Sequence, residues 1–98
     1  MAKIIWTSEA SQWLKDIFDY ISEDNYEAAN NVVKGIYKKA QILKEFPEIG
    51  YKYKHMSDRN IRILLYGHYR IAYEVTTISD IFILGIYHGS LKIENYLF

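Results

Sequence analysis

The chain has 98 residues, of which half are hydrophobic and 16% are aromatic, and its formal net charge is zero. This length suits one small domain, which we place over residues 1–98. The apolar content is enough for a packed core, and the composition gives no sign of disorder. The sequence contains no cysteine, which excludes disulfides, thiolate metal sites and cysteine nucleophiles and is consistent with a reducing compartment.

The first predicted elements are a short strand and a helix. Residues 3–6 form an apolar run of strand length. Ser8 is the expected N-cap of the helix that follows, with Glu9 in its first turn. Apolar residues then recur at spacings of three and four, which is typical of one buried helix face: Ala10, Trp13, Leu14, Ile17, Tyr20 and Ile21. The helix is expected to stop near residues 22–25.

A second amphipathic helix is predicted from about Tyr26 to Phe46. Its apolar stripe consists of Ala29, Val32, Val33, Ile36, Tyr37, Ala40 and Leu43. Pro47 disfavours helix at the residue before it, and Gly50 confirms that the chain leaves the helix. Two such helices joined by a short turn make an αα hairpin.

After a polar loop at residues 50–60, the apolar period changes from 3.6 to 2. Strands are predicted at residues 61–66, 69–75 and 81–88, and Gly67 opens a two-residue type II′ turn between the first two. The order βααβββ predicts an α+β fold, with the helical hairpin packed on one face of a mainly antiparallel sheet. The apolar runs are too short for a signal peptide or a membrane span, so a cytoplasmic protein is expected.

The two-residue turn also predicts which residues share a sheet face. It pairs Leu65 with Arg70, Ile63 with Ala72 and Ile61 with Glu74, and directly paired residues lie on the same side of a sheet. The side that contains Ala72 carries fewer large groups on its strand. We therefore expect this side to face away from the helices as a shallow concave surface.

Charge is distributed unevenly along the sequence. Residues 1–31 carry two basic against six acidic side chains, residues 32–70 carry nine against three, and residues 71–98 carry one against three. The basic middle could attract an acidic partner. Within it, Lys52 and Lys54 alternate with tyrosines, either as a partner-binding surface or as a solvated connector.

The order and spacing of several motifs resemble the RelE/ParE superfamily of type II toxins. The motifs are "DYI" at the end of the first helix, "FPEIG" after the second, "YRIAYEV" and "ILGIYHG". The resemblance implies the same βααβββ fold. It also implies a cognate antitoxin, a small protein with a DNA-binding domain, as partner.

The resemblance implies one of two mechanisms, of which the ParE-like one is favoured. ParE-like members bind DNA gyrase, whereas RelE-like members cut messenger RNA on the ribosome. Two lysines that such nucleases carry would fall on Ile61 and Ile63, which neither donate a proton nor hold charge. Arg62 fits the ParE pattern better. The lead prediction is therefore a toxin that inhibits growth by binding gyrase.

Two alternatives to gyrase binding remain open from the sequence alone. The first is a metal-independent, ribosome-dependent endoribonuclease similar to YoeB, in which Arg70 holds the scissile phosphate and His88 moves the proton. The second is a degenerate toxin that acts only as an antitoxin-binding module. In either case, Arg62 or Arg70 is expected to pair with an antitoxin carboxylate. No cofactor is predicted, and no metal site, because the three histidines lack suitably spaced companions.

Overall fold

The computed structural model describes residues 3–53 and 58–96, and its framework is one five-stranded sheet in the order β1-β5-β4-β3-β2. The strands are β1 (Ile4–Trp6), β2 (Tyr51–Lys52), β3 (Ile61–Tyr66), β4 (Tyr69–Val75) and β5 (Ile81–His88). β1 runs parallel to β5 and the other pairs are antiparallel. The predicted α+β class and order are confirmed. β2, which lies in the predicted polar loop, is the addition, and its two residues are too few to show a period.

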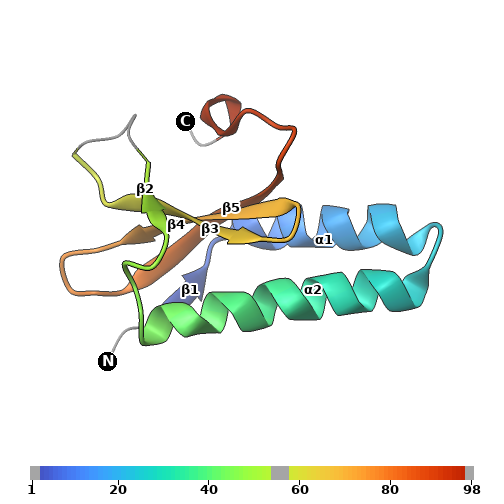
Figure 1. Ribbon diagram of the computed structural model, residues 1–98, viewed down its shortest axis with the longest axis horizontal. Coiled ribbons are helices and arrows are strands. Elements are labelled where there is room, and N and C mark those ends of the chain that lie inside the picture. The colour runs from blue at the N-terminus through green and yellow to red at the C-terminus, as the bar shows by residue number, and fades with distance from the viewer. Residues whose placement is uncertain (1–2, 54–57, 97–98) are drawn as a thin grey trace.

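Two antiparallel helices, α1 (Ser8–Ser22) and α2 (Tyr26–Gln41), lie on one side of the sheet. Two short 3-10 turns, η1 (Ile42–Lys44) and η2 (Ile93–Asn95), complete the chain. Figure 1 shows the C-terminal segment on the side of the sheet away from α2. Within residues 3–53 and 58–96, no helix combines the length and the apolar character needed to cross a membrane.

The helix boundaries differ from prediction at two places. The N-cap of α1 is Thr7, not Ser8, because the Thr7 hydroxyl accepts the Ala10 amide at 3.1 Å and also donates to the Ile83 carbonyl at 2.7 Å, which ties the helix start to β5. The α-helical part of α2 ends at Gln41 instead of Phe46. The chain tightens into η1 there, with the Glu45 amide donating to the Ile42 carbonyl three residues earlier, at 3.1 Å.

The hairpin of β3 and β4 has the predicted register, including the pairs of Leu65 with Arg70 and Ile63 with Ala72. Gly67 has φ of +56° at the first turn position, as a type II′ turn requires. A two-residue turn leaves no freedom to shift this pairing. The prediction succeeded because the register follows from turn length alone.

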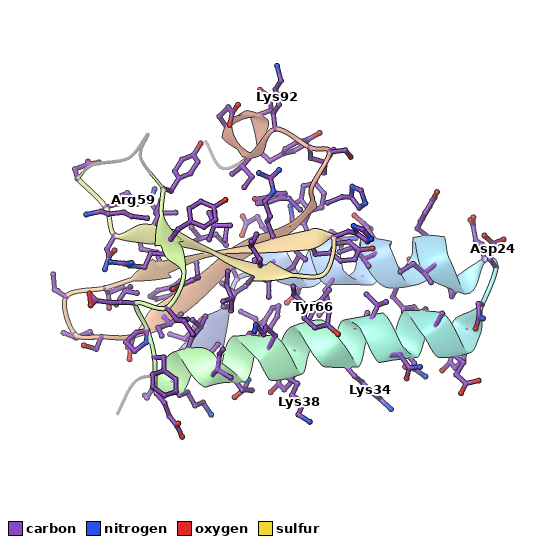
Figure 2. The ribbon with its side chains drawn as sticks, in the orientation of Figure 1. Asp24, Lys34, Lys38, Arg59, Tyr66 and Lys92 are labelled. Atoms are coloured by element: carbon purple, nitrogen blue, oxygen red, sulfur yellow. The ribbon has the colours of Figure 1, made fainter. Side chains whose placement is uncertain are left out.

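The main core lies between the helices and the sheet. Fully buried residues from each helix meet fully buried residues of the two strands β4 and β5: Ala10, Ile36, Ala40, Ile71, Tyr73, Ile83 and Ile86. Tyr66 reaches from β3 toward α2 (Figure 2). Its hydroxyl occupies the space that a Cβ at Gly35 would need, 1.8 Å away, so the glycine lets this ring lie against the helix.

Candidate functional site

Arg70 lies on the sheet face away from the helices, as predicted. Its direct neighbours across the sheet are Leu65 on β3 and Tyr87 on β5. One guanidinium nitrogen, Nη2, donates to the carbonyls of Leu91 and Gly89, both in the segment that follows β5. Arg70 therefore holds the C-terminal segment against the sheet, a contact that the sequence did not indicate.

The concave open surface expected on this face is absent from the described structure, and that expectation was wrong. Ile61, Ile63 and Ala72 have exposed fractions of 0%, 1% and 0%. They pack in a second core with Tyr87 and Ile93, the latter contributed by η2. The C-terminal segment thus covers the positions at which a related nuclease would carry its lysines.

Arg70 and His88 are not brought together on one face. Arg70 pairs with Tyr87, whereas His88 pairs with Tyr69. Because successive strand residues alternate between faces, Arg70 and His88 point to opposite sides of the sheet. The His88 ring packs edge-on against Tyr69, with centroids 5.7 Å apart.

His88 has a local hydrogen-bonding role at the end of β5. Its Nδ1 accepts the Ser90 amide at 3.2 Å and lies 2.9 Å from the Ser90 hydroxyl. The histidine therefore caps the turn that starts the C-terminal segment. The exposed ring also stacks on His68 at a centroid distance of 6.2 Å.

Arg62 forms hydrogen bonds to the loop that follows the second helix. Its Nη1 donates to the carbonyls of Glu48 at 3.2 Å and Gly50 at 2.9 Å, and its Nε donates to Asn60 at 3.1 Å. Its Nη2 also lies 3.8 Å from the Glu48 carboxylate. Gly50 in turn donates its amide to the Tyr73 hydroxyl at 2.9 Å. Arg62 thus holds this loop against β3.

The remaining predicted cations are Lys52 and Lys54. Lys52 is exposed on β2, and Lys54 lies outside the described residues. Arg59, which the sequence did not single out, forms a bidentate pair with Glu74 at 2.7 and 3.0 Å. This pair lowers the pKa of Glu74 through the hydrogen bonds and the charge of Arg59.

Sequence reasoning missed an apolar groove between the two helices. It has a volume of about 390 Å³ and is lined by residues of β1, α1 and α2: Trp6, Ser11, Leu14, Lys15, Phe18, Val33 and Tyr37. A second cavity of about 350 Å³ follows the outer edge of β1 and shares Trp6 and Tyr37 with the first. The two form one continuous surface, which we call the interhelical groove.

A signal for this groove was present in the second helix. Its apolar stripe is two residues wide, with Val32 and Ile36 on one half and Val33 and Tyr37 on the other. Ile36 is fully buried, whereas Tyr37 is 52% exposed and stacks on Trp6 at 5.8 Å. The apolar stripe of α2 is therefore wider than the face that packs on the sheet, and its outer half can contact another molecule.

The two walls of the interhelical groove differ in charge. α1 exposes Asp16 and Asp19, while α2 exposes Lys34 and Lys38, which point away from the sheet in Figure 2. Lys15 is engaged by Asp19 at 2.8 Å, and this contact raises the pKa of Lys15. The apolar floor is therefore flanked by acids on one side and lysines on the other.

No group of three or more potential metal-ligating side chains occurs within residues 3–53 and 58–96.

The buried phenol of Tyr87 has a strongly raised pKa. Burial, with a smaller contribution from the charge of Glu9, raises the pKa of Tyr87 to about 12, so this hydroxyl stays protonated at neutral pH.

Comparisons with known proteins agree with this geometry. A family model described as the ParE toxin of the type II toxin-antitoxin system parDE matches residues 4–92. A solved chain described as the chromosomal ParDE TA system from P. aeruginosa is 24% identical, with a TM-score of 0.72 over 90% of this chain and 96% of that chain, which shows a shared fold. No curated protein matches the sequence. The chain belongs to the ParE toxin family of type II toxin-antitoxin systems.

Proposed function

We propose that this toxin inhibits growth by binding DNA gyrase and that it does not cut RNA. The observation that carries the proposal is the burial of Ile61 and Ile63 beneath the C-terminal segment. Phosphodiester cleavage needs cations beside the developing phosphorane charge and a group that moves protons. Neither isoleucine supplies these, and no substrate reaches them while the segment is in place.

The separation of Arg70 from His88 also argues against the nuclease alternative. An arginine on one sheet face and a histidine on the other are not aimed at a single phosphodiester. Arg70 is engaged by two backbone carbonyls and His88 by a turn. Both residues have structural roles that explain their presence without catalysis.

We propose that the cognate antitoxin occupies the interhelical groove. Between the helices the groove is apolar, no described part of the chain covers its outer half, and β1 beside it is an edge strand of the described sheet. An amphipathic helix or an added strand fits such a surface, with acidic residues directed to Lys34 and Lys38. Arg62 and Arg70, expected earlier to meet a carboxylate, would act instead by holding the loops that shape the toxin surface. Lys52 stays available for a direct contact.

Gyrase cleavage complexes on plasmid DNA test the target. Purified toxin added to gyrase and supercoiled plasmid should increase the linear DNA recovered after denaturation. The protein encoded beside the toxin should abolish this increase when added at equal concentration. A toxin that stops growth but leaves gyrase unaffected would contradict the proposed target and leave the family assignment intact.

Two tyrosine substitutions test the antitoxin surface. Tyr37→Ser removes a ring that lines the groove, and we expect about tenfold weaker antitoxin binding. Tyr20→Ser is the matched control, since Tyr20 is 78% exposed and does not line the groove. Equal affinities of both variants, measured by calorimetry, would exclude the groove as the antitoxin site.

A further inference from the structure

A separate pocket, outside the interhelical groove, lies on the other side of α1 and shares no lining residue with that groove. It has a volume of about 330 Å³ and lies between the start of α1, Arg59 and the C-terminal segment. Its lining consists of Thr7, Glu9, Trp13, Arg59, Leu84, Tyr87 and Tyr96. Neither the family nor the proposed gyrase contact assigns a role to this pocket.

Aromatic rings build one wall of the pocket. Trp13 stands nearly perpendicular to Tyr87 and Tyr96, at centroid distances of 4.9 and 5.2 Å. The two tyrosine rings are close to parallel and 5.8 Å apart. The three rings therefore form a corner, and π faces of this kind attract planar cations.

Gly85 fixes the position of one of these rings. A Cβ on Gly85 would lie 2.2 Å from the Tyr87 hydroxyl, so only glycine leaves room for the tyrosine to lie back along β5. The ring is 1% exposed, and its hydroxyl stays protonated because burial raises its pKa to about 12. It offers the pocket a hydrogen-bonding group and no charge.

The charge of the pocket comes from Glu9. The other ionised lining side chain, Arg59, is matched by Glu74 through a bidentate pair at 2.7 and 3.0 Å. Glu9 has no ion-pair partner within residues 3–53 and 58–96, and its carboxylate accepts only the hydroxyl of Ser8, at 3.2 Å. The uncompensated charge is therefore negative, and the complementary ligand is a cation.

We propose that this pocket binds the guanidinium group of an arginine side chain from a protein partner. A guanidinium is planar, stacks on aromatic faces and donates paired hydrogen bonds to a carboxylate, which matches the ring corner and Glu9. The volume suits one long side chain. Figure 2 shows Arg59 on the side of the sheet that carries Lys92, away from Lys34 and Lys38 on α2. The pocket thus stays open when the interhelical groove is filled, and it does not depend on gyrase being the target.

Fluorescence of Trp13 tests this proposal on the full chain. In a Trp6→Phe background Trp13 is the single tryptophan, and circular dichroism verifies the fold. We expect N-acetyl-arginine amide to change this fluorescence saturably, and the neutral isostere N-acetyl-citrulline amide to bind at least about fivefold more weakly. N-acetyl-glutamate and AMP, which represent acidic peptides and nucleotides, should not bind more tightly than the citrulline compound.

Substitutions locate the site. Glu9→Gln should weaken the arginine compound about fivefold, and Tyr96→Ala should weaken it without unfolding, because Tyr96 is 47% exposed. Glu27→Gln is the matched control, since Glu27 occupies the first turn of α2 as Glu9 does in α1. The proposal is overturned by equal binding of arginine and citrulline compounds, by unchanged affinity in Glu9→Gln, by preferred binding of AMP or glutamate, or by no binding of the arginine compound.

Discussion

The two faces of the sheet are covered in different ways. On one face, α1 and α2 bury a continuous core that includes Ile36 and Ile71. On the other, the segment after β5 is attached by Ile93, by Leu91 and by the hydrogen bonds of Arg70. The first cover distributes its contacts over two long helices, whereas the second depends on a few identifiable side chains. We therefore expect one cover to unfold with the domain and the other to be able to detach by itself.

The largest effect is expected in the helix-covered core. Ile36→Ala removes a fully buried side chain between α2 and the sheet, and should lower the free energy of unfolding by about 2–5 kcal/mol. Val33→Ala, one turn earlier on the groove side of the same helix, should cost about 1 kcal/mol or less. Urea denaturation measures both. Similar losses would mean that the two halves of the helix stripe are equally buried.

A smaller and local effect is expected for the second cover. Ile93→Ala should release the C-terminal segment while the helix-covered core stays folded, at a cost of about 1–3 kcal/mol. The amides of Asn95 and Tyr96, which donate to Lys92 and Ile93, should then exchange faster with deuterium. Strand amides of β4 should keep their protection. If both sets accelerate together, the cover is part of the global core.

Removal of the Arg70 head group should have the next largest effect. Arg70→Met keeps most of the stem and deletes the donors to Gly89 and Leu91, so we expect a loss of about 1–2 kcal/mol. Lys52→Met is the control, because Lys52 is exposed on β2. Stability by urea denaturation and amide exchange of the C-terminal segment are both measured. An unchanged segment would show that Ile93 alone retains it.

The smallest effect is the pH dependence of the Arg59–Glu74 pair. Arg59 lowers the pKa of Glu74 from the ordinary value of 4.5, so the folded state binds this proton less readily than the unfolded state does. The stabilisation is then fully present above the unfolded pKa and is lost as pH falls through the lower folded pKa. It should amount to about 1 kcal/mol or less, because the pair is partly exposed.

The comparison of the wild type with Glu74→Gln isolates this contribution. The difference in free energy of unfolding should be constant near neutral pH and shrink in acid below the ordinary carboxyl range. Glu45→Gln, at the exposed residue that follows η1, controls for the loss of one carboxylate. A difference that grows with acidification would contradict the direction of the pKa shift.

The sequence predicted the parts of the fold that follow from a regular apolar period or from a fixed turn length. The hairpin register followed from a two-residue turn, and the helices followed from apolar spacing, so the face of Arg70 was known before its surroundings. The cover of that face was not predicted, because residues 89–96 have no period and bury mainly one side chain, Ile93. The expected open site was therefore wrong even though the face was right.

The candidate sites were less accessible from the sequence than the fold. Arg62 and Arg70 were chosen as candidates because they are charged. The sequence does not distinguish an arginine that donates to a loop carbonyl from one that binds a ligand, because that requires the position of the loop. The interhelical groove is lined by residues of the helix stripe that was predicted to be buried in the core. The pocket of Trp13 and Tyr96 is lined by residues far apart in the chain. Only the tertiary structure brings such residues together.

The most direct test of a toxin that binds without cutting is cleavage of messenger RNA on programmed ribosomes. The wild-type protein would be used at a concentration that traps gyrase, with the cleavage products mapped by primer extension. We expect intact message, because the sheet face of Ile61 and Ile63 is closed and Arg70 and His88 lie on opposite faces. Message cut in the decoding site, and spared by Arg70→Met or His88→Ala, would contradict it.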